Sequence, residues 1–302
     1  AASSFFLVRT RMSIEICVLG SGSSGNSTLV RIAGEPILID AGFGPRTLAK
    51  RLIGTGVELA EIKTILLTHL DRDHFTPTWM PYLVKNNVRL CIAERHRYAL
   101  NGAAERSTLP AAPKLLHKAG LLTMISSNAF TLPTPRGAAM VRPIHLAHDN
   151  EGTVGFIIEA DGKRLGYATD LGHVPDRLVD ALIDCDVIAL ESNYDDHLQE
   201  SSSRPMGLKR RVMGNRGHLS NGEALATLRK VFDRSTRLPA HVVLLHLSRD
   251  CNCRNLVKEM YRPHRTIAER LHLSSQAEPT GWLRPVITAD AHLPGEQLRM
   301  FA

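Results

Sequence analysis

The chain has 302 residues, 43% of them hydrophobic and 22% charged, so it can build the core of a soluble globular protein. No apolar run approaches the length of about 20 residues that a membrane-spanning helix needs, so no membrane partner is expected. The net charge of +7 favours a polyanionic partner such as nucleic acid, although basic chains are common. The five cysteines, an odd number without a repeated metal-binding pair, predict a reduced and cytoplasmic protein.

The domain organisation is expected to be simple. Residues 1–12 are predicted to be an N-terminal tail outside the fold, because Met12 directly precedes the first strand-like run. Residues 13–302 are predicted to form a single domain. No Gly/Ser/Pro-rich linker in that range is long enough to separate two domains.

Short strands joined by a glycine-rich turn are predicted at the start of this domain. The turn is the stretch from Gly20 to Ser27, where glycines permit a tight reversal of the chain. Asp40 directly follows the last of these strands, a position from which a carboxylate can support a ligand site. The predicted strands span residues 14–19, 28–32 and 36–39, and a helix is expected at residues 47–52.

The next predicted strand, residues 62–67, ends in an unusual cluster of polar side chains. His69, Asp71, Asp73 and His74 place four potential metal ligands within six residues. Imidazole and carboxylate groups at this density suit a hydrolytic divalent-metal centre. A solvated acidic turn is the alternative, but such a turn would not need two histidines that flank two aspartates.

Further strands and helices are predicted along the rest of the chain by apolar periodicity and turn signals. A β-hairpin turns at Asp161 and Gly162, and Pro263 disturbs a long helical pattern near the C-terminal end. Strands are expected at residues 89–93, 123–126, 139–144, 152–160, 163–168, 187–190, 242–245 and 284–289, and helices at 174–183, 222–232 and 252–271.

Three of these strands are followed by a further potential metal ligand. His148 follows the strand at residues 139–144, Asp170 follows the hairpin, and His246 follows the strand at residues 242–245. Ligands at the ends of separate strands can converge on one point, because open sheets carry their sites at the ends of strands. The sequence therefore predicts one metal centre that is built from four segments.

This spacing resembles the metallo-β-lactamase superfamily, with its signature His-x-His-x-Asp-His followed by a distant His, a distant Asp and a last His. The resemblance covers about residues 14–247 and implies an α/β fold, the four-layer αββα sandwich. It also implies two divalent metal ions, Zn²⁺ or Mn²⁺, with Fe²⁺ as a further candidate. The implied ligands are His69, Asp71 and His148 at site one, Asp73, His74 and His246 at site two, and Asp170 as a bridge.

Asp71 departs from this pattern, because the family has its second histidine at that position. An aspartate oxygen reaches a similar distance from the backbone as the Nδ1 atom of histidine, so Asp71 can bind without movement of the chain. A charged oxygen ligand should favour harder ions such as Mn²⁺ or Fe²⁺ over Zn²⁺. In the alternative, Asp71 turns away and site one is weak or empty.

A second loop, Gly217-His218-Leu219-Ser220-Asn221, stands ahead of the last metal-binding histidine. This arrangement resembles tRNase Z, in which the loop histidine contacts the scissile phosphate and assists departure of the leaving oxygen; His218 matches it. A basic run leads directly into this loop and favours phosphate binding. The run consists of Arg204, Lys209, Arg210, Arg211 and Arg216.

The wider set of motifs is similar to the WalJ/YycJ-like group of metallo-β-lactamase-fold nucleases. It adds the Gly20–Ser27 turn, Thr169-Asp170-Leu171-Gly172 and Glu191-Ser192-Asn193-Tyr194-Asp195. The resemblance implies a metal-dependent hydrolase that cleaves DNA from a 5′ end, so we expect DNA rather than RNA as the partner.

The same resemblance suggests roles for individual side chains. Asp73 would orient the attacking water and His218 would donate a proton to the leaving oxygen. Arg210 or Arg211 would hold a neighbouring phosphate. Asn193 would brace the ligand loops or touch the substrate.

Three alternatives stay open at this point. The protein could instead be a phosphodiesterase for RNA or a small cyclic nucleotide, and the basic run argues for a polymer. A thioesterase or lactonase would use the same metal centre on a different bond. A DNA-binding protein with a degenerate, metal-poor site is favoured only by Asp71, since the other six ligands are present.

Overall fold

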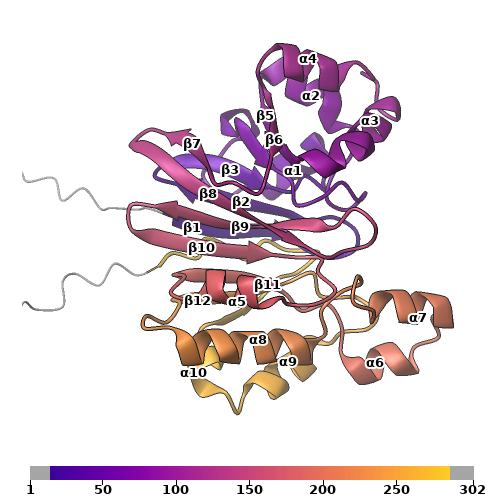
Figure 1. The fold of residues 1–302 in the computed structure, drawn as a ribbon, viewed down its shortest axis with the longest axis vertical. Coiled ribbons are helices and arrows are strands. Elements are labelled where there is room, and N and C mark those ends of the chain that lie inside the picture. The colour runs from indigo at the N-terminus through magenta and orange to yellow at the C-terminus, as the bar shows by residue number, and fades with distance from the viewer. Residues whose placement is uncertain (1–13, 286–302) are drawn as a thin grey trace, which may run out of the picture.

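Two β-sheets pack face to face between two layers of helices in a computed structural model that describes residues 14–285 (Figure 1). The four-layer α/β sandwich predicted from the sequence is therefore confirmed. The predicted tail at residues 1–12 and most of the predicted strand at 284–289 lie outside the described residues. No helix among the described residues is long and apolar enough to cross a bilayer.

The first sheet contains six strands in chain order. Its first three strands are antiparallel, and the last three continue from the third in parallel. The strands are β1 (Ile14–Gly20), β2 (Ser27–Ile32), β3 (Glu35–Ile39), β4 (Thr64–Leu66), β5 (Arg89–Ala93) and β6 (Leu122–Ile125). The outer face of this sheet packs against α1 (Pro45–Arg51), α2 (Trp79–Asn86), α3 (Arg97–Glu105) and α4 (Ala112–Lys118).

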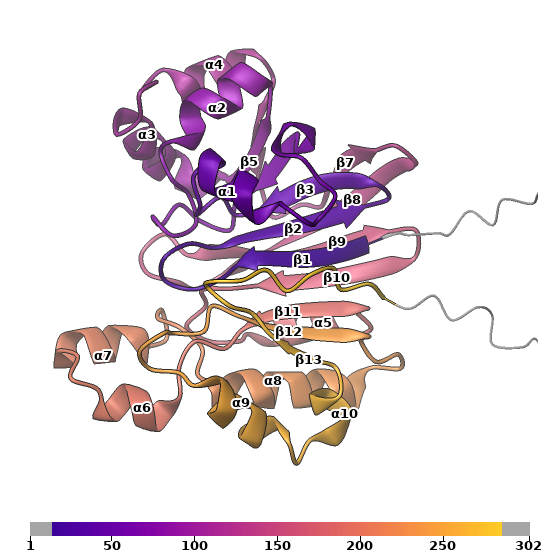
Figure 2. The same cartoon turned by 180° about the vertical axis from the view of Figure 1, so that it is seen from behind.

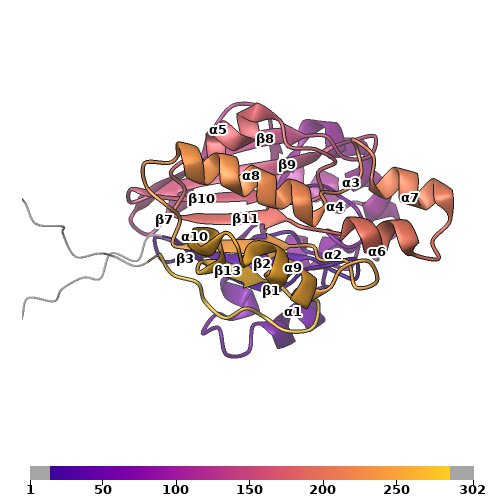
Figure 3. The ribbon, with the colours of Figure 1, turned by 90° about the horizontal axis from the view of Figure 1, so that it is seen from below.

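The second sheet has seven strands and repeats the same plan of antiparallel strands followed by parallel ones. Its strands are β7 (Phe130–Thr134), β8 (Gly137–Leu146), β9 (Thr153–Ala160), β10 (Lys163–Ala168), β11 (Val187–Glu191), β12 (His241–Leu245) and β13 (Leu271–Leu273). Its outer face is covered by α5 (Asp176–Leu182), α8 (Asn221–Arg234), α9 (Arg254–Tyr261) and α10 (Arg265–Ala268), as Figure 3 shows.

Three apolar cores hold these layers together. The core between the sheets takes side chains from both, such as Val30 and Phe156, which are 0% exposed. Strands β11 and β12 are apolar except for Glu191 at the end of β11 and His241 at the start of β12, because both of their faces are buried. The two remaining α-helices, α6 (Asp196–Ser201) and α7 (Met206–Val212), project to one side of the sandwich (Figure 2).

The helical pattern predicted at residues 252–271, with its disturbance at Pro263, forms two separate helices. The helix α9 ends at Tyr261, two residues before Pro263, and the chain then forms the short helix α10. Proline lacks the backbone N–H of a helix interior, which explains the interruption. Leu271–Leu273 then forms β13, which pairs in parallel with β12 at the sheet edge. A strand of three residues is too short to give a periodic signal.

Candidate metal centre

The parallel strands of both sheets end at one common edge, where the predicted ligands gather. Ala168 of β10 aligns with Leu190 of β11, and Leu190 aligns with Leu244 of β12. The residues that follow these positions are Asp170, Glu191 and His246, so the register itself brings them to one edge. In the first sheet Ile39 aligns with Leu66, which places Asp40 beside the start of the His69–His74 motif.

The motif after β4 forms a tight turn that points its side chains inward. The backbone N–H groups of His74 and Phe75 both donate to the carbonyl of Asp71, each at 2.8 Å. The carbonyl of Asp73 accepts a hydrogen bond from the backbone N–H of Asn26 at 2.6 Å. A side chain at Gly42 would clash there, because its Cβ would lie 1.9 Å from the Asp73 oxygen. Glycine at position 42 therefore lets the turn approach the loop after β3.

All seven predicted ligands come together at this edge. His69, His148 and Asp170 offer donor atoms within 4.8 Å of one another, and so do Asp73, His74 and His246. Asp71 lies beside the first group, with its Oδ2 atom 3.8 Å from Nε2 of His69 and 3.9 Å from Nε2 of His148. Its side chain is half exposed, at 51%. Asp71 thus faces the centre and does not turn away.

The donor atoms fit a bound cation. The Nε2 atoms of His69 and His246 are buried and have no hydrogen-bond partner among the described residues. Buried polar atoms are rarely left unpaired unless a water or an ion fills the position. Nε2 of His246 lies 3.4 Å from Oδ2 of Asp73, and Nε2 of His74 lies 3.7 Å from the same oxygen. Two ligands at about 2.1 Å from one tetrahedral metal are about 3.4 Å apart, so these gaps have the size that a shared ion requires.

In three of the candidate ligand histidines, the Nδ1 atom has a hydrogen-bond partner that fixes the orientation of the ring. Nδ1 of His74 lies 2.8 Å from Oδ2 of Asp40, whose other oxygen accepts the backbone N–H of Thr68 at 2.9 Å. Nδ1 of His69 lies 2.9 Å from the hydroxyl of Thr68, and Nδ1 of His148 lies 2.9 Å from the carbonyl of Gly217. Such partners orient each ring so that its Nε2 atom faces the centre. Asp40 thus has the supporting position predicted for it, whereas Thr68 gave no signal in the sequence.

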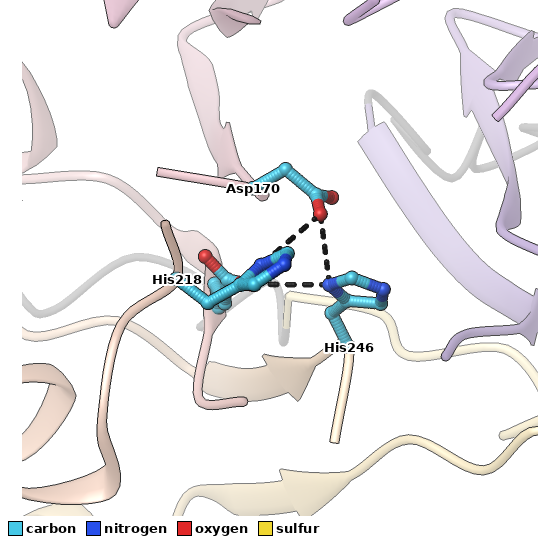
Figure 4. A group of neighbouring side chains, drawn as sticks. Asp170, His218 and His246 are labelled. Atoms are coloured by element: carbon cyan, nitrogen blue, oxygen red, sulfur yellow. Dashed lines mark hydrogen bonds and ion pairs between the residues drawn. The ribbon is translucent and has the colours of Figure 1, made fainter. Parts of the chain in front are cut away.

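Asp170 occupies the middle of the centre and contacts three histidines, two of which are drawn in Figure 4. Its Oδ1 atom lies 2.9 Å from Nδ1 of His246 and 3.3 Å from Nδ1 of His218. Its Oδ2 atom lies 2.9 Å from Nε2 of His74. Both oxygens of this 2%-exposed residue therefore face donor groups from separate segments.

His218 is held at this centre by Glu191 and by the start of α8. Oε1 of Glu191 lies 2.8 Å from Nδ1 of His218 and 3.0 Å from Nδ1 of His246. Ser220 caps α8, because its side chain accepts from the N–H of Glu223 while the Glu223 carboxylate accepts from the N–H of Ser220. The cap fixes the loop directly after His218. Nε2 of His218 makes no hydrogen bond within residues 14–285, and the ring lines the cavity described below.

Three residues of the centre adopt a backbone conformation that side chains rarely adopt. The φ angles of Asp40, Asp170 and His246 are +61°, +53° and +55°. A non-glycine residue in this region costs about 1–3 kcal/mol and persists where the surrounding structure imposes it. All three residues follow the ends of strands, so the strain turns their side chains toward the centre.

The charges of the centre are strongly coupled. Burial alone would raise the pKa of Asp170, but the imidazoles of His246 and His74 hold that pKa well below its usual range. Burial alone would lower the pKa of His74, but Asp170 and Asp40 raise it well above its usual value. A cation that binds Nε2 of His74 must therefore displace a proton.

A cavity of about 450 Å³ opens over these ligands. Its walls include Arg211, which forms an ion pair with Asp149, and Arg204, which lies 3.3 Å from Asp250. Arg210 is exposed and does not line the cavity, so Arg204 replaces it as the second arginine near the centre. Asn193 lines the cavity, but its side-chain amide donates to the carbonyl of His246 at 2.8 Å, which is the bracing contact expected for it.

Comparison with known proteins places this geometry in a family. The family model described as "Beta-lactamase superfamily domain" matches residues 36–247. Exodeoxyribonuclease YycJ of Bacillus anthracis is 25% identical over 249 residues, which cover 82% of this chain and 87% of that protein. Ribonuclease Z of Mycobacterium tuberculosis is 30% identical over 176 residues, which cover 52% of this chain and 62% of that protein.

Solved structures of known proteins share this fold. The crystal structure of human tRNase Z, short form, superposes with a TM-score of 0.58 at 16% identity, covering 90% of this chain and all of that one. The predicted resemblance to the WalJ/YycJ-like group is confirmed, and so is the prediction of a hydrolase at the level of the family. The matched range spans more than half of the chain and contains both the strand ends and the ligand cluster. The chain therefore belongs to the family described as the Beta-lactamase superfamily domain and is a hydrolase of the metallo-β-lactamase fold.

Proposed function

We propose that this protein is a metal-dependent phosphodiesterase that removes nucleotides from the 5′ end of DNA. The observation that carries the proposal is the position of Asp170, which lies between two metal-binding groups and also contacts His218. A proton donor beside a paired cation site is the arrangement that cleavage of a phosphodiester requires. The exodeoxyribonuclease name of the relative that covers most of this chain supports DNA as the polymer.

The ligand set consists of the seven residues predicted from the sequence. Site one would be held by His69, Asp71 and His148, and site two by Asp73, His74 and His246, with Asp170 shared. Divalent ions at these positions, Zn²⁺ or Mn²⁺ with Fe²⁺ as a further candidate, would supply Lewis acidity and a water of lowered pKa.

The protein's own side chains complete the reaction. Asp73 orients the attacking water, and its carboxylate is itself fixed by the side-chain amide of Asn26 at 3.2 Å. His218 gives its proton to the leaving oxygen through Nε2, while Glu191 keeps Nδ1 occupied. Arg211 and Arg204 line the cavity and bind neighbouring phosphates by charge-assisted hydrogen bonds.

End-labelled single- and double-stranded DNA and RNA, incubated with Mn²⁺, Mg²⁺ or Zn²⁺, test this proposal. With 5′-labelled DNA the label should appear at once in a short product. With 3′-labelled DNA the same enzyme should give a ladder of shortening fragments. Internal cuts, or faster hydrolysis of RNA, would contradict the proposal of a 5′ DNA exonuclease.

An RNA phosphodiesterase is the second candidate. The observation that favours it is the match to ribonuclease Z over about half of this chain, at 30% identity. The RNA arm of the same experiment decides between the two polymers. A silent result on both polymers with metals bound would favour a thioesterase or lactonase.

Asp71 gives a separate prediction about the metal. If Asp71 binds through oxygen, the enzyme should work best with Mn²⁺, and Asp71→His should shift the preference toward Zn²⁺. Asp71→Ala should lose the site-one metal and most of the activity. Metal stoichiometry of the wild type and both variants checks this expectation. Unchanged metal content and rate in Asp71→Ala would remove Asp71 from the ligand set.

A further inference from the structure

A second cavity, of about 680 Å³, lies apart from the metal centre on the outer side of the second sheet. Its walls are formed by α9, α10, β13 and the segment at residues 275–280. It is larger than the cavity of about 450 Å³ over the metal ligands. None of the residues that line it belongs to the site described above.

One face of α9 supplies most of the charge in this cavity. Arg254, Lys258 and Arg262 follow one another at four-residue intervals, so their side chains lie in one row along the helix. The adjacent face packs into the core through Val257 and Tyr261, both 0% exposed, and Tyr261 also lines the cavity. Like charges at this spacing repel one another, so the row weakens the helix unless an anion offsets it.

The row is only partly neutralised by the protein. Arg262 forms an ion pair with Glu259 at 2.9 Å, but Lys258 has no ion-pair partner in the part of the chain that the structure describes. Arg254 donates to the carbonyls of Ser274 and Leu273 at 2.8 and 3.1 Å. These two bonds fix its guanidinium at the cavity wall and leave further N–H donors for a ligand. Arg265 of α10 adds a fourth cation to the lining, where it pairs with Glu269 at 2.8 Å, and Glu259 and Glu278 are the acidic residues of the lining.

The second cavity is connected to the metal centre through shared loops. Asp250 lines the metal cavity, and Arg254, four residues later, lines the second one. On the other side Ser23 lines the metal cavity, and its neighbour Ser24 donates through its backbone N–H to the side chain of Gln276 at 2.8 Å. A polymer carries phosphates at regular intervals and can occupy more than one site at once, whereas a single nucleotide occupies only one.

We infer that this second cavity binds the sugar–phosphate backbone of the nucleic-acid substrate at a distance from the reacting phosphate. The inference rests on the proposed function, since it gives the polymer a second point of attachment. The row of cations on α9 makes contacts to phosphate oxygens without reading the bases. The site therefore adds affinity for long strands and leaves the sequence preference unchanged.

The test compares two double variants with equal changes in charge. Lys258→Glu/Arg262→Glu reverses two cations of the cavity, and Arg229→Glu/Lys230→Glu reverses two exposed cations of α8 as the control. The probe is a 5′-phosphorylated DNA of about 20 nucleotides, longer than a typical strand-binding site, and its affinity is measured by fluorescence anisotropy over a range of salt concentrations. Circular dichroism and the melting temperature show whether each variant is folded. Lys258→Ala/Arg262→Ala replaces the first variant if the reversed charges prevent folding.

The cavity variant should bind this DNA about tenfold more weakly than the control. The slope of its log affinity against log salt concentration should correspond to about two fewer phosphate contacts. Binding of a dinucleotide, which reaches only the metal centre, should be equal in both variants. Equal affinity of both variants for the long DNA would overturn the inference. A selective loss of binding to inorganic phosphate or a mononucleotide, with unchanged binding of long DNA, would instead assign the cavity to a small phosphate ligand.

The wild type separates this test from the proposed function. If the wild type neither binds nor cleaves the long DNA, the proposed function fails and this inference fails with it. If the wild type cleaves the DNA while both double variants bind it as the wild type does, only the second site is rejected.

Discussion

Asp170→Ala is expected to abolish hydrolysis and to lower the metal content of both sites. One carboxylate holds the centre together here, because its two oxygens contact His246, His218 and His74 from three different segments. Removing it leaves these imidazoles without their shared partner, and the buried cluster loses the negative charge that attracts cations. Metal analysis of the purified variant, together with its rate on a generic phosphodiester, measures both effects.

The backbone at this position requires a matched control. Asp170 has a φ angle of +53°, and alanine tolerates this conformation less well than asparagine does. Asp170→Asn keeps the size and the backbone preference and removes only the charge. It should also lose metal, whereas His246→Ala should mainly empty site two. Two bound metals and full activity in Asp170→Ala would contradict the ligand assignment.

The fold was predictable wherever buried strands gave long apolar runs. Residues 163–168 and 187–190, for example, were expected as strands and form β10 and β11 with shifts of at most one residue. No strand was predicted at Leu271–Leu273, where β13 consists of only three residues and depends on pairing with β12. Pairing of this kind is a tertiary effect that local sequence does not encode.

The site was predictable to the extent that its residues have a special chemical type. Histidine and aspartate at strand ends marked the candidate ligands, and the structure brings all seven to one edge. Thr68 and the carbonyl of Gly217 support two of the ligand histidines, but a threonine and a backbone oxygen have no distinctive pattern in a sequence. Arg204 lines the cavity and Arg210 does not. This difference depends on how α7 is oriented, which the run of basic residues alone did not indicate.

His218→Ala is expected to keep its metals and its affinity for DNA but to lose about 10²-fold or more in rate, as general acids typically contribute. A loss of 10²-fold corresponds to about 2.7 kcal/mol of transition-state stabilisation. Burial alone would lower the pKa of His218, but Glu191 and Asp170 raise it above its usual value, so the ring holds the proton that a leaving oxygen needs. His173→Ala is a suitable control, because that histidine is exposed and its one hydrogen bond within residues 14–285 is to the carbonyl of Asn215, at 3.0 Å.

The leaving group distinguishes the acid role from a purely structural one. A nitrophenolate departs without a proton, so the loss in His218→Ala should shrink on a nitrophenyl diester and remain large on DNA. Equal losses on both substrates would remove His218 from the acid role. His218 also belongs to a group with Asp170, Glu191 and His246 whose donor atoms lie within 4.8 Å of one another. Loss of a metal ion in His218→Ala would therefore show that this histidine also supports the metal centre, as a ligand or through its contacts with Asp170 and Glu191.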